Sequence, residues 1–356
     1  TVFIGDNRQG KTQALYTAYS FLDLPGCAAY ANDYLTTAAL NLPEFETCCE
    51  ELTKKGNASI DLIQYFTNHG QEYLNNLSTI IPTHIHKLLG ASEGRYSNLK
   101  INYHLSTEDT DRIKNVLLPT PLNTEINGVG IKLIKEEGKS DLILYKTKNF
   151  NEKIPSSEIK AVLLLNIFGL FHTALYKGVN YLPSERCSIS VILQMISNLG
   201  LIKTNEINGK TLKSTDFQET INAMQGVSFP IQEYIATLYT LLYDFKISED
   251  RKKLTTPEEI QQYEKLADLL TEKIIGDSVT LKLNKAGTAK KISVETNGKD
   301  IDVSLASSGV KGLMGLVLNL RYLSTKGKTI LIDEPEENLH PTQQTALAEF
   351  LAILVN

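Results

Sequence analysis

A glycine-containing loop close to the start of the chain constrains its fold more than any other feature. The segment Gly5-Asp6-Asn7-Arg8-Gln9-Gly10-Lys11-Thr12 follows the short apolar run Val2-Phe3-Ile4 and introduces a helical pattern. A strand, a glycine-rich loop and a helix in this order let the backbone fold around a phosphate, with the first amide groups of the helix facing the anion. The sequence therefore predicts a phosphate-binding loop (P-loop) in an α/β fold.

The residue types in this loop predict separate roles in holding a nucleotide. Lys11 is expected to reach the β- and γ-phosphates, and the hydroxyl of Thr12 is expected to bind Mg²⁺. The residues expected to contact the nucleotide here are Gly5, Asn7, Gln9, Gly10, Lys11, Thr12 and Gln13. ATP and Mg²⁺ are the expected ligands.

An acidic strand end lies far along the chain. The segment Thr329-Ile330-Leu331-Ile332-Asp333-Glu334 is an apolar run closed by two carboxylates. Asp333 suits a group at the Mg²⁺ site, and Glu334 suits the base that orients or deprotonates the attacking water. Taken alone, the pair is also typical of a solvated loop start. Together with the P-loop, it predicts a nucleoside triphosphatase.

A third motif precedes the acidic strand by about twenty residues. The segment Ser307-Ser308-Gly309-Val310-Lys311 introduces the helical spacing of Leu313, Leu316, Val317 and Leu320. It resembles the signature motif of ABC-type ATPases, although Ser308 is also compatible with a simple helix cap. The segment Pro335–Pro341 resembles the D-loop of the overcoming-lysogenization-defect (OLD) and RecF-like branch of these ATPases.

This resemblance implies a fold and a mechanism. The fold class is α/β: a P-loop NTPase with an ABC-type ATPase head, a mixed central sheet and a helical insertion. In such heads ATP is sandwiched between two protomers, so the chain is expected to form a homo-oligomer, at least a dimer. Ser308 and Gly309 then contact the nucleotide of the partner protomer, while Lys11, Glu334 and Ser308 take the catalytic roles and Thr12 and Asp333 the metal roles.

The segment Tyr181-Leu182-Pro183-Ser184-Glu185-Arg186-Cys187 resembles a strand-plus-Pro-x-Glu-Arg segment of ATPases in bacterial antiphage systems of the Septu, PARIS and Gabija types. Arg186 is compatible with nucleotide sensing or with subunit contact. Because an arginine after a strand more often pairs with a surface carboxylate, a structural ion pair is the favoured interpretation.

The chain is expected to form three parts. Residues 1–187 form the N-terminal part of the head with an insertion, residues 188–275 a helical arm, and residues 276–356 the C-terminal part of the head. A helix is expected over 158–176, and another behind Thr256-Pro257-Glu258-Glu259, which has the pattern of a capping box. The alternating stretch Ile131 to Leu144 predicts strands. Further strands are expected at Val279–Leu283, Lys291–Glu295 and Ile301–Leu305, with Asn297-Gly298 as a hairpin turn.

Composition indicates an intracellular globular enzyme. The 356 residues are 42% hydrophobic with a net charge of −5, and they contain no run of eighteen apolar residues and no signal peptide. A cytoplasmic location without membrane contact is expected. Nucleic-acid binding remains possible through short basic clusters such as Arg251-Lys252-Lys253 or Lys290-Lys291. Cys27, Cys48, Cys49 and Cys187 lack metal-ligand spacing and are expected to be reduced core thiols.

Three functions are compatible with these patterns. The favoured one is an ATP-hydrolysing subunit of an antiviral defence complex that controls a nuclease or toxin effector. The alternatives are an OLD-type nuclease whose catalytic domain lies outside this chain, and a RecF-like DNA-repair ATPase. The histidine that ends the next strand in such heads is missing, so we expect further segments outside this sequence.

Overall fold

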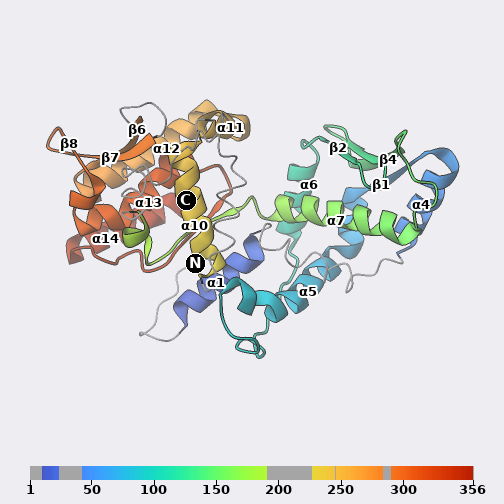
Figure 1. Cartoon of the computed structure of the whole chain (residues 1–356), viewed down its shortest axis with the longest axis horizontal. Helices are drawn as coiled ribbons and strands as arrows, with labels where there is room; N and C mark the ends of the chain where they lie inside the picture. The colour runs from blue at the N-terminus through green and yellow to red at the C-terminus, as the bar shows by residue number, and fades with distance from the viewer. Residues whose placement is uncertain (1–9, 24–41, 191–226, 245, 284–289, 356) are drawn as a thin grey trace, which may run out of the picture. The chain divides into compact units, whose positions relative to one another are not determined.

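The computed structural model describes residues 10–23, 42–190, 227–244, 246–283 and 290–355 (Figure 1). The chain divides into two compact units. One, here called the split unit, combines Thr1–Tyr19 with Val179–Asn356, and the other, the inserted unit, is Ser20–Gly178. These units divide the chain differently from the three ranges expected from the sequence, because the described helices of residues 227–275 share a core with the C-terminal elements.

The core of the split unit is built around helix α13 (Ser308–Tyr322). Ser307 caps this helix by accepting a hydrogen bond from the backbone N–H of Val310 at 3.2 Å. The predicted apolar positions are all buried, and the buried aliphatic and methionine side chains of α13 are Val310, Leu313, Met314, Leu316, Val317, Leu318 and Leu320. Each fully buried side chain of this size contributes roughly 1.5–3 kcal/mol. The helix is therefore an element around which its neighbours are organised.

Helices that precede and follow α13 in the sequence pack around it. These are α10 (Phe229–Tyr243), α11 (Ile247–Leu254), α12 (Pro257–Leu270) and α14 (Pro341–Val355). Helix α12 contacts both α13 and α14 (Figure 1). Its predicted capping box is confirmed, since Thr256 Oγ1 accepts from Glu259 N at 3.3 Å and Glu259 Oε2 accepts from Thr256 N at 3.1 Å. A π-helical turn, Thr271–Ile275, continues the chain to Gly276.

Two parallel strands position residues of the candidate functional site at their ends. Strand β9 (Thr329–Ile332) pairs with β5 (Val179–Leu182), with Leu331 opposite Tyr181 and Ile332 opposite Leu182. The pairing continues by one bond, because Asp333 N donates to Leu182 O at 2.9 Å. Both strands therefore end at the same edge of the sheet. There the backbone of Asp333 and Glu334, after β9, contacts Arg186 in the segment that follows β5.

An antiparallel sheet precedes α13. Its strands are β6 (Ser278–Leu283), β7 (Lys290–Thr296) and β8 (Lys299–Ile301). The Asn297-Gly298 hairpin is confirmed, with both residues at positive φ (51° and 73°), as a type I′ turn requires. The strand expected over Ile301–Leu305 is wrong beyond Ile301. Asp302 accepts from Ser304 N at 2.9 Å and starts the 3₁₀ turn Val303–Leu305 instead.

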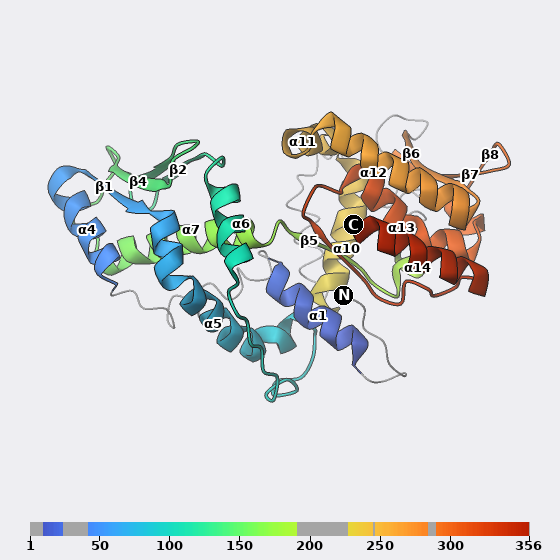
Figure 2. The same cartoon turned by 180° about the vertical axis from the view of Figure 1, so that it is seen from behind.

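In its described residues from Leu42 onward, the inserted unit combines four helices with an antiparallel sheet of order β1-β4-β3-β2 (Figure 2). The strands are β1 (Asn57–Asp61), β2 (Leu122–Ile126), β3 (Ile131–Lys135) and β4 (Asp141–Lys146). The helices are α4 (Pro43–Lys55), α5 (Leu62–Leu88), α6 (Thr107–Leu117) and α7 (Ser156–Leu175). Buried residues oppose each other across the strands, as with Ala58 and Leu144 or Leu133 and Leu144. The alternation predicted between Ile131 and Leu144 thus gives the sheet its apolar face.

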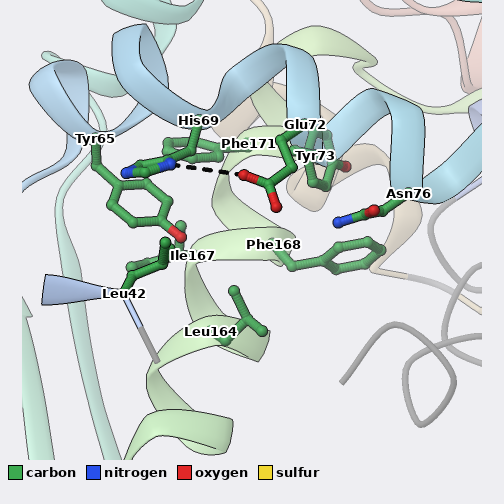
Figure 3. Close-up of a pocket in the computed structure, with 10 residues that line it drawn as sticks. All are labelled: Leu42, Tyr65, His69, Glu72, Tyr73, Asn76, Leu164, Ile167, Phe168 and Phe171. Atoms are coloured by element: carbon green, nitrogen blue, oxygen red, sulfur yellow. Dashed lines mark ion pairs between the residues drawn. The ribbon is translucent and has the colours of Figure 1, made fainter. Parts of the chain in front are cut away.

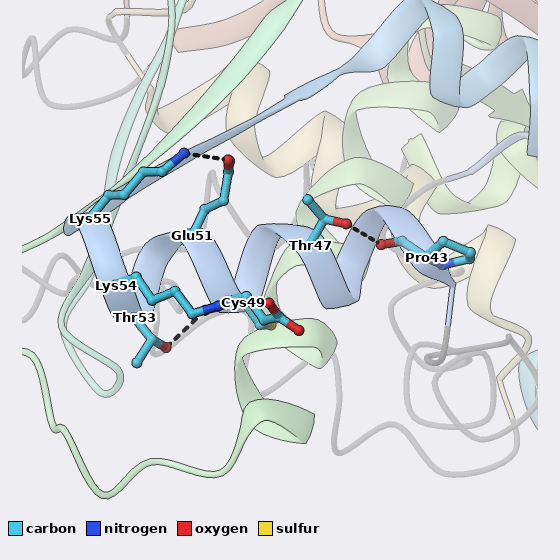
Figure 4. A network of polar contacts seen from close by, with 8 residues as sticks. Pro43, Thr47, Cys49, Glu51, Thr53, Lys54 and Lys55 are labelled. Atoms are coloured by element: carbon cyan, nitrogen blue, oxygen red, sulfur yellow. Dashed lines mark hydrogen bonds and ion pairs between the residues drawn. The ribbon is translucent and has the colours of Figure 1, made fainter.

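Helix α4 has distinct polar and buried sides. On the polar side, Lys54 pairs with Glu50 at 3.0 Å and Lys55 with Glu51 at 2.6 Å, one turn apart (Figure 4). Such exposed pairs each stabilise a helix by only about 0.3–0.5 kcal/mol. On the other side Cys48 and Cys49 are buried free thiols, as predicted for these two residues. Burial raises the pKa of Cys48 to about 12, so this thiol is chemically inert near neutral pH.

Helix α7 is the one described helix long and apolar enough to cross a bilayer. Just over half of its most apolar window, 56%, is buried within the structure, where it packs against α4, α5 and α6. Its buried aromatic residues stack inside the unit, as Phe171 does on Tyr65 with ring centroids 5.9 Å apart. This is the environment of a core helix in a globular unit.

Candidate nucleotide-binding site

The helix that follows the glycine-rich loop begins where the sequence predicts. Helix α1 (Lys11–Leu22) starts immediately after Gly10, which has a positive φ of 79° and accepts the helical hydrogen bond from Ala14 N at 2.9 Å. Lys11 and Thr12 are therefore in its first turn, where free amide groups and the helix dipole favour an anion. Gln13 is exposed one residue later. Gly5, Asn7 and Gln9 lie outside the described residues.

Thr12 and Asp333 meet although 321 positions separate them. The hydroxyl of Thr12 donates to Asp333 Oδ2 at 2.8 Å, and the Asp333 side chain is buried, with 3% of the residue exposed. The hydroxyl of Tyr181 lies 3.5 Å from the same oxygen. The structure thus brings together the two residues that the sequence assigned to the metal.

Tyrosine side chains line the buried side of this pair. Tyr16 from α1 packs on Tyr181 with ring centroids 5.3 Å apart, and Ser228 donates to the Tyr16 hydroxyl at 3.3 Å. Burial raises the pKa of both phenols, with the Asp333 carboxylate adding to the effect. Both hydroxyls therefore stay protonated and supply neutral hydrogen-bond donors next to a buried carboxylate.

Glu334 leaves the strand in an unusual backbone conformation. Its φ is +45°, in the left-handed region that residues with a Cβ rarely occupy, and its side chain is exposed. Its carbonyl accepts from Glu337 N at 3.0 Å, which closes a turn around Pro335 and Glu336. Asp333 and Glu334 are neighbours in sequence, yet one is buried beside Thr12 and the other faces solvent.

Arg186 is buried beneath this turn, with 1% of the residue exposed. Its guanidinium donates to four backbone carbonyls: Pro183 at 2.9 Å, Gly312 at 2.6 Å, Asp333 at 2.6 Å and Glu334 at 2.8 Å. The pairing with a surface carboxylate favoured from the sequence is therefore wrong. The guanidinium is a planar fork with five N–H donors, so it can bind several carbonyls that converge on one point. An ion pair with a single surface carboxylate would use only some of these donors.

The N-terminus of α13 presents the signature residues. Because Ser307 takes the capping role, the capping alternative considered for Ser308 does not apply, and Ser308 is exposed. Gly309 packs against the turn after β9, where a Cβ would lie 3.2 Å from Leu339 Cδ2. A Cβ on Gly312 would lie 3.4 Å from Glu337 O. The signature helix and the D-loop-like turn are thus in direct contact within one chain.

The comparisons with known proteins agree with this arrangement. The family profile described as the AAA ATPase domain matches residues 1–356, which is the whole chain. The chain belongs to the AAA ATPase domain family. No curated protein and no solved structure gives a significant match. Membership of this family makes the chain a P-loop NTPase, a class of proteins that binds nucleotides.

The residues of this AAA ATPase domain that face each other fit Mg²⁺. Mg²⁺ prefers hard oxygen ligands, usually one or two protein groups together with water and substrate phosphates. The hydroxyl of Thr12 and the carboxylate of Asp333 are two such oxygens 2.8 Å apart. Elsewhere, within the part of the chain that the structure describes, no cluster of three or more His, Cys, Asp or Glu side chains is arranged to hold a metal.

Several other sequence-based candidates in the AAA ATPase domain have structural roles. Arg251 is buried and donates to the carbonyls of Leu320, Arg321 and Ser324 at the end of α13, so it does not belong to an exposed basic cluster. The spacing of His84 and His86 in the sequence would place both side chains on one face of a strand, where they could bind a metal together. They lie in helix α5 instead, where side chains two positions apart do not share one face. His340 Nδ1 lies 2.9 Å from Thr342 Oγ1 in the first turn of α14.

The inserted unit contains a polar cluster that the sequence did not indicate. His69 Nε2 lies 3.1 Å from Glu44 Oε1. Its Nδ1 lies 3.8 Å from Glu72 Oε2, and His69 and Glu72 line a cavity of only about 20 Å³ (Figure 3). The hydrogen bond from His69 lowers the pKa of the Glu44 carboxyl. Aromatic residues, including Tyr65 and Phe168, form the rest of the lining. The cavity is too small for a nucleotide and holds at most one water molecule.

Proposed function

We propose that this chain binds ATP with Mg²⁺ and hydrolyses it slowly to ADP and phosphate. The contact between Thr12 and Asp333 carries the proposal, since it joins the helix after the glycine-rich loop to the acidic strand end. Two motifs that are weak when taken singly become specific when their side chains meet. Membership of the AAA ATPase domain family supports the same reaction.

In this proposal the phosphates are bound at the N-terminus of α1. Lys11 pairs with the β- and γ-phosphates, and the free amide groups of the first helical turn donate to phosphate oxygens. Thr12 and Asp333 hold the Mg²⁺ ion, which supplies neutralisation of the negative charge that develops on the phosphates. Glu334 orients the attacking water and accepts its proton. The water oxygen bonds to the γ-phosphorus, and the bond from this phosphorus to the oxygen that bridges the β- and γ-phosphates breaks, which releases ADP.

A second protomer completes the site in this proposal. Ser308 and Gly309 at the exposed start of α13 face the terminal phosphate bound by the partner, so that each ATP is sandwiched between two copies. Support comes from the free hydroxyl of Ser308, which is exposed because Ser307 caps the helix. A hydroxyl and a bare glycine amide at a helix N-terminus provide donors for an anion.

Two substitutions test the hydrolytic mechanism. Glu334→Gln is expected to keep ATP affinity within about threefold while slowing turnover by about 100-fold or more, because the amide cannot accept the proton. Lys11→Ala is expected to weaken ATP binding instead. Calorimetric titration and phosphate release measure the two quantities separately. Normal turnover by Glu334→Gln would remove Glu334 from the reaction.

For the biological role, we propose an ATP-dependent control subunit of a cytoplasmic antiviral defence complex whose effector is a nuclease or a toxin. The resemblance of the Tyr181–Cys187 segment to ATPases of such systems supports this role. Purification of the full-length protein with the products of its neighbouring genes tests it. A stable complex with a second protein is expected. Binding to DNA ends or gaps by a homodimer without a partner would favour a repair ATPase instead.

A further inference from the structure

We propose that Arg186 is a positioning residue for ATP hydrolysis, which fixes the backbone of Glu334 and ties it to the signature helix α13. The inference rests on the proposed function, because it assigns how the base of that reaction is held. The hydrogen bonds of the Arg186 guanidinium all end on backbone carbonyls. Arg186 acts on the reaction only through the backbone groups that its guanidinium binds.

The first observation is where the four hydrogen bonds go. Two of them end on the carbonyls of Asp333 and Glu334, at 2.6 and 2.8 Å. These residues carry the carboxylates assigned to Mg²⁺ and to the attacking water. A buried guanidinium bound to both carbonyls fixes the orientation of both peptide planes, and with it the direction in which each side chain leaves the backbone.

The second observation is the backbone conformation at Glu334. A glutamate at φ +45° is strained, and such a residue persists only where its surroundings over-determine it. The surroundings here are the turn bond from Glu337 N and the Arg186 bond, both ending on the Glu334 carbonyl. Without the guanidinium, one of these two restraints is lost and a more relaxed conformation becomes accessible.

The third observation links this turn to α13. Arg186 Nε donates to Gly312 O at 2.6 Å, and Gly312 lies one helical turn after the exposed Ser308. The same guanidinium therefore contacts the helix that is proposed to meet the ATP of the partner and the turn that carries the base for its own ATP. The Arg186 side chain thereby couples two events: the binding of α13 to a second protomer and the alignment of Glu334.

A second buried arginine, Arg251 of α11, binds the same helix α13 and makes the proposal testable. Arg251 is also buried, and it also donates to backbone carbonyls at α13, but at the C-terminal end of that helix. Within the described residues its hydrogen bonds do not reach the turn after β9. Arg186→Lys and Arg251→Lys thus remove equivalent chemistry from opposite ends of one helix. A lysine keeps the charge but cannot reproduce the planar fork.

The experiment compares both variants of the full chain with wild type in ATP affinity, kcat, KM and melting temperature. For Arg186→Lys we expect kcat to fall by about 10- to 100-fold, because small displacements of a catalytic group have effects of this size. ATP affinity and KM are expected to stay within about threefold. Both variants are expected to lower the melting temperature, and by similar amounts. The kcat of Arg251→Lys is expected to stay within about twofold of the wild-type value.

A double-mutant cycle separates positioning from a general structural effect. If Arg186 acts through Glu334, then Arg186→Lys has little further effect on single-turnover hydrolysis in the Glu334→Gln background. Equal fractional losses with and without Glu334 would overturn the proposal. So would a kcat for Arg186→Lys that matches that of Arg251→Lys.

Two further outcomes are informative. Should Arg186→Lys not fold, Arg186→Gln retains a planar donor group and replaces it in the same comparison; failure of both variants to fold when Arg251→Lys folds would show a purely structural arginine. Wild-type protein without ATPase activity would refute the proposed function and the positioning role together. Active wild type with unaffected Arg186→Lys would refute the positioning role alone.

Discussion

The hydrogen bond from the Thr12 hydroxyl to the Asp333 carboxylate joins the two sequence motifs of the candidate site. Sequence reasoning assigned both residues to one metal, and the structure places their oxygens 2.8 Å apart. Arg186 could not be assigned in the same way, because its partners are backbone carbonyls that no residue type reveals. The one available signal was an arginine directly after a strand that ends in Pro183, and that signal favoured an ion pair at the surface.

Titration of a single residue is expected to limit the acid stability of the inserted unit. His172 is fully buried, and burial lowers its pKa from 6.5 to about 4. Between these pH values the unfolded chain binds a proton that the folded chain does not. The free energy of unfolding therefore falls as pH decreases through this window, by about 3 kcal/mol in total.

Urea unfolding of the full chain at pH 7, 5.5 and 4.5 measures this dependence. In His172→Gln the part of the pH dependence that comes from this residue should disappear, while the amide still has the hydroxyl of Tyr73 as a partner, which lies 2.8 Å from His172 Nδ1. Carboxylates such as Glu44 titrate in both proteins and cancel in the comparison. An unchanged slope in the variant would contradict the assignment to His172.

At the scale of elements, the sequence predicted a helix, strand or turn correctly where hydrophobic periodicity and capping or turn residues agreed. Helix α13, strand β9, the Asn297-Gly298 turn and the capping box of α12 all lie where the sequence predicts them. The strand expected to reach Leu305 failed because Asp302 offers the backbone a competing local hydrogen bond, which alternation alone does not reveal. The helix expected over 158–176 was found as α7, with ends shifted by one or two residues.

Close packing of α13 predicts a steric requirement at Gly315. A Cβ at this position would lie 2.7 Å from the hydroxyl oxygen of Tyr234 on α10, and Tyr234 is itself buried. Gly315→Ala is expected to destabilise the protein by about 1–3 kcal/mol despite the better helix propensity of alanine. Thermal unfolding by calorimetry measures the loss.

Two companion variants interpret that measurement. Tyr234→Phe removes the clashing oxygen, so Gly315→Ala should lose less stability in its presence. Gly169→Ala in α7 has no atom within 4 Å of its added Cβ and should be neutral or stabilise by up to about 1 kcal/mol. If Gly315→Ala and Gly169→Ala behave alike, close packing at Gly315 is not the reason for its glycine.

At the scale of the whole molecule, the chain divides into a split unit and an inserted unit. Sequence reasoning predicted an insertion but not that the described helices between residues 227 and 275 would share a core with α13. The apolar residues that decide this, such as Leu238 and Leu270, have ordinary helical spacing. Their partner surface is set by tertiary packing, which hydrophobic spacing within a single helix does not specify.

Assembly across ATP is the prediction that belongs to this scale. In the Glu334→Gln background, ATP with Mg²⁺ is expected to convert the protein to dimers, measured by light scattering. Ser308→Arg should prevent this conversion through steric and charge effects, while ATP binding by the single protomer stays within about threefold. Ser157→Arg, at an exposed serine of the inserted unit, is the matched control. Dimers that form equally well with Ser308→Arg would place the interface elsewhere.

The separation of Thr12 and Asp333 by 321 positions also orders events in time. During synthesis at about 5–20 residues per second, the first turn of α1 leaves the ribosome roughly 15 to 60 seconds before its carboxylate partner is made. The inserted unit, whose described strands pair with one another in one sheet, is fully translated in that interval. Strand β5 waits without β9 for about the second half of that interval. The pair that is proposed to hold Mg²⁺ therefore forms only after β9 has emerged, so nucleotide binding at this site would follow translation of the whole inserted unit.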